Sequence, residues 1–285
     1  MTKRAALWFV ILSIGLIALS PRMSLAQGAG DLIVTPTRIV FEDRMRSAQV
    51  TLSNRGSATA TFRISLIDMQ MDENGEMREA QPGDAGSAVN LVRHSPRQIN
   101  IAPGAHQVVR LALRKPASLA EGEYRSHMFF RAVPPETAGR SVTDETALEK
   151  NELRIQLIPI YGVTIPVIVR HGALSVNAGI AKAVHLPASG ELPRRLQIAL
   201  TRGGDRSAFG DLVAAYQAPG GGEEIIVGRI SRLAVYTPNE KRNVVMTLQV
   251  PDGVTLKPGG SLRVTYRATE NEGGQVLAEQ SIRLK

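Results

Sequence analysis

Hydrophobic and polar residues alternate over most of this chain, the pattern of β-strands that bury one face. Clear examples are residues 48–53, 61–67 and 107–114, which are separated by turns rich in Gly, Pro and Asn. No segment of useful length after residue 26 follows the 3.6-residue period of an amphipathic helix. The sequence therefore predicts an all-β protein.

The predicted strands fall into two groups on either side of His171-Gly172. About seven short strands at regular spacing precede this point, as in an immunoglobulin-like sandwich. The second group comprises residues 174–176, 195–201, 212–216, 225–227, 234–236, 244–250, 261–268 and 276–284. We therefore predict an immunoglobulin-like sandwich over residues 27–170 and a second all-β sandwich over residues 171–285.

Residues 153–170 form the longest alternating stretch, which is one very long strand or two strands end to end. Pro159 and Pro166 lack the N–H that a strand in mid-sheet would donate, so we predict a sheet edge, with Gly162 between them as a bulge. A polar segment, residues 136–151, precedes the stretch. An apolar edge promotes aggregation unless it is covered or used. Its alternating apolar residues are Leu153, Ile155, Leu157, Tyr161, Val163, Ile165, Val167 and Val169.

The first 26 residues have the three parts of an export signal. Basic residues at Lys3 and Arg4 precede an apolar run, and Ser24-Leu25-Ala26 provides a small-x-small cleavage site. The run is shorter than the roughly 20 residues that a membrane span needs. We predict cleavage after Ala26 and a mature protein in the periplasm, without stable membrane insertion.

Charge and composition exclude several function classes. The net charge of +8 at pH 7 falls to +5 without Lys3, Arg4 and Arg22, and the remaining basic residues are scattered rather than gathered into a nucleic-acid footprint. The absence of cysteine excludes disulfides, thiol catalysis and zinc–thiolate sites. The five histidines have no metal-ligand spacing, and no nucleophile elbow or phosphate loop is present. The sequence therefore indicates neither an enzyme nor a cofactor or metal site.

Several segments, in this order, are similar to the PapD-like periplasmic pilus (fimbrial) chaperones. They are residues 37–41, Pro103-Gly104 before the strand at 107–114, residues 128–135 ending in a double proline, and the long strand ending at Arg170. The resemblance covers most of residues 32–170 and is weaker beyond. It implies two immunoglobulin-like domains set at an angle.

The resemblance also implies a function in fimbrium biogenesis and cell wall organization. In that family the long edge strand complements a pilus subunit that lacks its last strand, a form of β-augmentation called donor-strand complementation. The implied partners are pilus, fimbrial or other surface-fibre subunits, with an outer-membrane usher as a further candidate. Arg38 would bind the subunit's terminal carboxylate. The side chains implied for subunit binding are Leu153, Ile155, Leu157, Tyr161, Val163 and Ile165.

One position departs from the family pattern. The lysine that helps to clamp the subunit's carboxylate is replaced by Pro166. Either Arg38 acts alone, another basic residue takes part, or the partner is anchored differently. The alternative is an envelope protein that uses the same edge for a fixed partner or a dimer, without chaperone activity.

The resemblance further implies a buried arginine between the two domains, paired with two acids. Arg170 corresponds to the arginine and Glu123 to one acid, while Glu270 or Glu272 corresponds to the other. A buried arginine without both acids would be destabilising.

Overall fold

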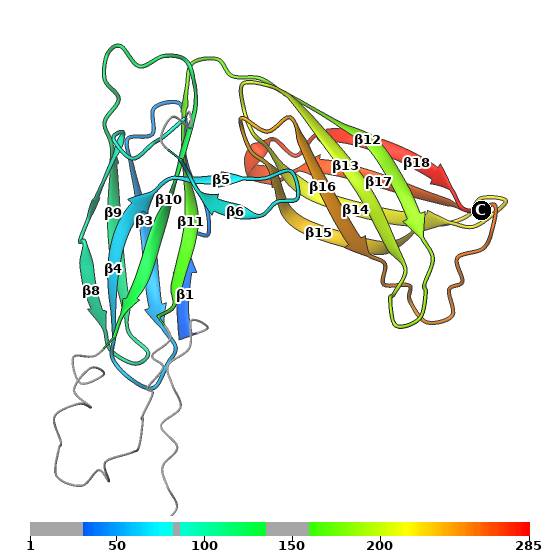
Figure 1. Cartoon of the computed structure of the whole chain (residues 1–285), viewed down its shortest axis with the longest axis horizontal. Helices are drawn as coiled ribbons and strands as arrows, with labels where there is room; N and C mark the ends of the chain where they lie inside the picture. Colours follow the sequence, from blue (N-terminus) through cyan, green and yellow to red (C-terminus); the bar gives the residue numbers. More distant parts are fainter. Residues whose placement is uncertain (1–30, 82–85, 135–159) are drawn as a thin grey trace, which may run out of the picture.

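The structure, a computed structural model, describes residues 31–81, 86–134 and 160–285. It consists of two β-sandwiches set at an angle (Figure 1), as predicted. The predicted signal segment, residues 1–26, and the segment that holds Leu153, Ile155 and Leu157 lie outside the described residues. None of the described residues form a helix that is long and apolar enough to cross a membrane.

The first sandwich packs a four-stranded sheet against a five-stranded sheet. The first sheet has the order β1 (Leu32–Thr35), β3 (Ser47–Asn54), β9 (His106–Leu113) and β7 (Val92–Ser95). The second has the order β2 (Ile39–Phe41), β11 (Gly162–His171), β10 (Gly122–Val133), β4 (Ala60–Ile67) and β8 (Gln98–Ile101). Every second residue of these strands turns inward, so that the core contains Phe41, Val50, Leu52, Ile101, Val109, Leu111, Met128, Phe130 and Val167.

The second sandwich is built in the same way from a three-stranded and a four-stranded sheet. The smaller sheet has the order β12 (Val176–Leu186), β13 (Arg195–Gly204) and β16 (Lys241–Thr247). The larger has the order β15 (Ile225–Val235), β14 (Ala208–Gln217), β17 (Ser261–Ala268) and β18 (Val276–Arg283), with the 3₁₀ helix η3 (Glu270–Glu272) before β18. Its separate core includes Leu196, Leu200, Leu212, Tyr216, Met246, Leu262, Val264 and Tyr266.

Two strands of the second sandwich differ from the prediction. β12 continues ten residues past Val176, and β15 is one strand where the sequence predicts two. β12 is an edge strand with a register shift between Ile180 and Lys182 and mostly half-buried residues. β15 has shifts in its pairing with β14. Such irregular strands lack the clean alternation by which a strand is found.

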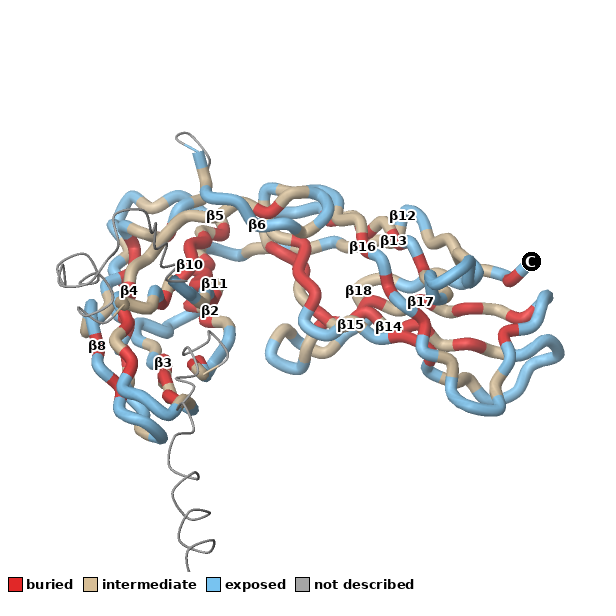
Figure 2. The backbone as a smooth tube through the Cα atoms, turned by 60° about the horizontal axis from the view of Figure 1, so that its bottom comes forward, coloured by how far each residue is buried: buried red, intermediate tan, exposed pale blue. Residues whose placement is uncertain are grey.

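A hairpin leaves the first sandwich and reaches the second, as Figures 1 and 2 both show. It consists of β5 (Met69–Met71) and β6 (Met77–Glu79), joined by the turn 72–75 that the Asn-Gly pair predicts. The turn prediction is confirmed. The reach of the hairpin has no signal in the sequence, because nothing local indicates a distant partner.

The bulge prediction at Gly162 is wrong. The register of β10 and β11 runs unbroken from Gly122–His171 to Arg131–Gly162. A glycine here leaves room for a neighbouring side chain: a Cβ at this position would overlap the ring of Phe129 unless that ring moved. The ring belongs to the neighbouring strand, so this constraint is absent from the local sequence.

Candidate functional site

The outer half of β11 forms an open sheet edge. β2 pairs with β11 in parallel only at Val167–Val169. In the described part of the chain, no strand pairs with residues 160–166 on that side. The predicted edge position therefore holds for the outer half of the strand, whereas the inner half lies between β2 and β10.

The main chain of this segment points alternately to β10 and to the open side. Ala132 N–H donates to the Tyr161 carbonyl oxygen over 2.9 Å. Because polar groups alternate in an antiparallel pair, the N–H and C=O groups of Gly162 and Thr164 turn to the open side, as does the Pro166 carbonyl. The missing N–H of Pro166 thus disrupts no bond to β10, which explains why a proline is tolerated here.

The burial of the side chains along this segment contradicts one predicted partner contact. Ile165 is only 2% exposed and belongs to the core of the first sandwich, together with Val167 and Val169. Its assignment to partner binding is wrong, because the alternating face that it shares turns into the sandwich core. Val163 is half-buried against the same core, whereas Tyr161 retains 38% of its surface.

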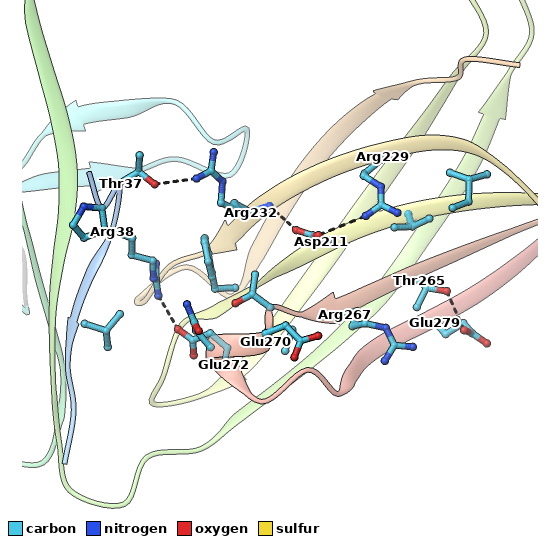
Figure 3. Close-up of a pocket in the computed structure, with 18 of the residues that line it drawn as sticks. Thr37, Arg38, Asp211, Arg229, Arg232, Thr265, Arg267, Glu270, Glu272 and Glu279 are labelled. Atoms are coloured by element: carbon cyan, nitrogen blue, oxygen red, sulfur yellow. Dashed lines mark hydrogen bonds and ion pairs between the residues drawn. The ribbon is translucent and has the colours of Figure 1, made fainter. Parts of the chain in front are cut away.

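A cleft of about 1030 Å³ lies between the two sandwiches, with Arg170 of β11 in its lining. One wall comes from the β2 region and includes Arg38, and the other is the outer face of β14, β15 and β17. Figure 3 shows Arg232 reaching toward Thr37 and Arg229 toward Asp211. The distances are 3.0 Å from Arg232 Nη1 to Thr37 Oγ1 and 3.7 Å from Arg229 Nη1 to Asp211 Oδ2. The cleft is therefore lined with arginines that already have partners.

Arg38 lines the cleft, but its side chain already binds residues of the second sandwich. Its guanidinium carbon lies 4.0 Å from the centre of the Phe209 ring. Nη2 donates to Glu272 Oε1 over 3.3 Å, and Nη1 donates to the Tyr236 hydroxyl over 3.4 Å. The side chain is 11% exposed, and its Nε has no hydrogen-bond partner among the described residues. A carboxylate entering the cleft would meet an arginine that already holds one.

Arg170 binds three carboxylates, of which only that of Glu272 comes from the second sandwich. Its Nε donates to Glu123 over 3.1 Å, Nη1 to Glu42 over 3.0 Å and Nη2 to Glu272 over 3.0 Å. The Arg170 side chain is 2% exposed and that of Glu123 is fully buried. The structure thus brings together Arg170, Glu123 and Glu272, while Glu270 lines the cleft.

The charges in this cluster shift one another's pKa values. Burial works to raise the pKa of Glu272, but the guanidinium groups of Arg170, Arg38 and Arg206 outweigh it and hold the pKa below its ordinary value. Burial likewise works to lower the pKa of Arg170, and Glu272, Glu123 and Glu42 raise it. Glu272 is therefore ionised at neutral pH, and its contribution to stability is present there.

Sequence reasoning missed several residues of this junction. Glu42 is an ion partner of Arg170 and lies 3.7 Å from Arg206. The Ser207 hydroxyl donates to Glu123. Phe209 and Tyr236 contact Arg38. No local pattern marks these residues, because each meets its partner only after folding, Glu42 from the end of the neighbouring strand β2 and the others across the domain junction. Among the described residues, no group of three or more His, Cys, Asp or Glu could hold a metal ion.

Residues 31–170 match the family of pili and flagellar-assembly chaperones, PapD N-terminal domain. Among curated proteins no sequence relative was found. The YadV chaperone aligns over its whole chain with 89% of this one, at 16% identity and a TM-score of 0.45. The Pseudomonas aeruginosa CupB2 chaperone aligns over its whole chain with 89% of this one, at 11% identity and a TM-score of 0.43. A chain of the Salmonella enterica complex between SafA pilin and the SafB chaperone aligns over 96% of its length with 89% of this one, at 11% identity and a TM-score of 0.39.

Proposed function

We propose that this protein, whose residues 31–170 belong to the PapD-like pilus-assembly chaperones, binds pilus or other surface-fibre subunits and keeps them from aggregating. Subunits that lack a strand expose an apolar groove and unpaired main-chain groups, so they aggregate unless another strand fills the groove. Export through the predicted signal, residues 1–26, would place the protein in the periplasm, where it would transfer subunits to an outer-membrane usher.

The observation that carries this proposal is the open edge at residues 160–166, which comprise the start of β11 and the two residues before it. It presents the outward main-chain groups of Gly162 and Thr164 beside two exposed apolar side chains, Ile160 at 47% and Tyr161 at 38%. An added strand gains affinity from main-chain hydrogen bonds and specificity from alternate side chains. We propose that the predicted donor residues Leu153, Ile155 and Leu157 extend this edge, with Tyr161 and Val163 at its inner end.

Binding can be tested by co-expressing the protein with a candidate subunit that lacks its last strand. Tyr161→Asp places a charge in an apolar groove, so we expect the complex to weaken at least about tenfold. Thr164→Pro removes one outward N–H, so we expect about a fivefold loss, the equivalent of one hydrogen bond. Dissociation constants of the purified pairs, measured by titration calorimetry, check both values.

Two controls separate binding from folding. Leu192→Asp puts the same charge on another exposed apolar residue, 51% accessible in the second sandwich, and should bind like the wild type. The melting temperature of Thr164→Pro should stay near that of the wild type, because position 164 has the same outward direction as Pro166. Unchanged affinity in both Tyr161→Asp and Thr164→Pro would refute β11 as the donor strand.

We further propose that the subunit's C-terminal carboxylate enters the cleft at Arg38, without a lysine at position 166. Charge-assisted hydrogen bonds contribute roughly 1.5–3 kcal/mol, so extending the subunit by a few residues past its native C-terminus should weaken binding about tenfold or more. This comparison leaves the chaperone unchanged and keeps the Arg38–Glu272 bond intact. Equal affinity for the native and extended subunits would mean that the terminus is anchored elsewhere.

One observation favours a second function. At the expected clamp, position 166 is a proline and Arg38 is already bonded to Glu272. Neither position therefore offers a free cation to a carboxylate. An envelope protein that uses the same edge for a fixed partner or for a second copy of itself would not need that clamp. Light scattering on the purified protein distinguishes the two, because a dimer that Thr164→Pro converts to monomer supports this second function.

A further inference from the structure

The β5–β6 hairpin of the first sandwich is hydrogen-bonded to the second sandwich at the edge of β16. Asn239 Nδ2 donates to the Met71 carbonyl oxygen over 2.6 Å. The Asn243 N–H donates to the Glu73 carbonyl oxygen over 2.6 Å, and Asn243 Nδ2 to Asn74 Oδ1 over 3.4 Å. The hairpin therefore binds through two main-chain carbonyl oxygens and two side chains, since Glu73 Oε2 also lies 3.6 Å from Lys241 Nζ.

The fit at the hairpin tip also depends on a glycine. Gly75 has φ +88°, which L-residues rarely adopt, and a Cβ there would lie 2.5 Å from Arg242 Nη2. Arg242 belongs to β16, and its Nη1 donates to the Ala234 carbonyl oxygen. Gly75 thus allows the turn to lie directly against a side chain of the other sandwich.

The loop that follows β15 is held from the first sandwich as well. Arg125 stacks over the ring of Tyr236 at 4.1 Å, and its Nη2 donates to the Thr237 carbonyl oxygen over 3.3 Å. Met71, next to the hairpin turn, is 5% exposed and lies in neither sandwich core. Residues 236–243 are consequently contacted by β10 and by the hairpin together.

We propose that the β5–β6 hairpin is a strap that fixes the angle between the two sandwiches and so sets the width of the cleft. Two domains joined by one short connection are expected to move relative to each other unless a further contact restrains them. The connection after β11 and the hairpin lie apart in Figure 1, so that together they restrict rotation more than either does alone. Asn239, Asn243 and Gly75 are the positioning residues of this strap. The inference concerns the junction alone and stands whether or not subunits bind.

The angle can be measured directly, because the chain has no cysteine and spin labels can be placed without background. Gln107→Cys on β9 and Gln197→Cys on β13 are exposed sites in separate sandwiches. With wild-type strap residues, pulsed electron paramagnetic resonance should give one narrow distance distribution. With Asn239→Ala and Gly75→Ala added, we expect the distribution to broaden about twofold, since the restraint that the hairpin adds to the other interdomain contacts is lost.

The matched control is Gly104→Ala. Gly104 also has positive φ, +71°, in the first sandwich, but no atom lies within 4 Å of its would-be Cβ. It therefore reproduces the backbone strain of Gly75→Ala without the contact. If the distribution stays narrow in the strap variant, or broadens equally in the control, the proposal is overturned.

A second variant tests the same proposal if the double variant does not fold. Asn239→Asp keeps the size of the side chain and places a carboxylate against the Met71 carbonyl. The side chain of Asn239 makes only the Met71 hydrogen bond in the described structure, so the effect is confined to the strap. Broadening in this single variant supports the strap, and an unchanged distribution refutes it. Subunit affinity, measured separately, tests the proposed function.

Discussion

Replacing Arg170 with alanine is expected to lower the free energy of unfolding by about 3–5 kcal/mol, the cost of removing one partner from a buried ion cluster. The substitution would leave Glu123, which is fully buried, without its cation, and would remove one of the cations that keep the pKa of Glu272 low. Denaturant titration at pH 7, followed by circular dichroism, measures the change. We expect the transition to become less cooperative as well, because Arg170 links the two sandwiches.

Arg170→Lys should lower the free energy of unfolding by less than Arg170→Ala does. Its ammonium group keeps the charge but cannot bind three carboxylates in one fixed plane. Arg110→Ala is the control: Arg110 is exposed on β9 and its loss should change stability by less than about 0.5 kcal/mol. A loss below about 1 kcal/mol for Arg170→Ala would contradict a structural role for the cluster.

Acidification from pH 7 to pH 4 is expected to destabilise the first sandwich by about 3 kcal/mol through His127 alone. Burial, with a smaller contribution from Arg125, lowers the pKa of this side chain from 6.5 to about 4. The unfolded chain takes up the proton below pH 6.5, whereas the folded chain does not until about pH 4. The stabilising contribution of the neutral His127 side chain is therefore fully present above pH 6.5, and it is lost as the pH falls from 6.5 to about 4.

Unfolding free energies measured at half-unit steps between pH 7 and pH 4 give the slope of stability against pH. His127→Leu should make this slope smaller. His106→Leu, an exposed position on β9, is the matched control and should keep the wild-type slope. Burial also lowers the pKa of His94, so a smaller slope of the same sign should remain. Glu272 contributes at lower pH, because its stabilising effect is lost only as the pH falls below the ordinary range of a glutamate. An unchanged slope in His127→Leu would contradict the assignment.

Alternation and turn chemistry predicted the fold because both act locally. The strand at 107–114 and the hairpin turn at 72–75 are present in the structure, since each is specified by its own residues. Most of β12 was missed because it is an edge strand with a register shift, which weakens the alternation that a buried face imposes.

The site was only partly predictable, for a different physical reason. A period-2 pattern identifies a face of a strand without saying what covers it, and Ile165 proved to face the core rather than a partner. The ion partner Glu42 and the aromatic Phe209 lie far from Arg170 and Arg38 in sequence, so that only folding brings them together. Gly162 could not be understood without the Phe129 ring on the adjacent strand.

Pro166 has one further consequence, for the length of any strand that joins this sheet. Beyond it, at Val167–Val169, the edge is already occupied by β2, and Pro166 itself offers an acceptor but no donor. An incoming strand therefore has Gly162 and Thr164 as its last complete pairing sites, whatever its own sequence. The proline acts as a register stop that fixes where the added strand must end.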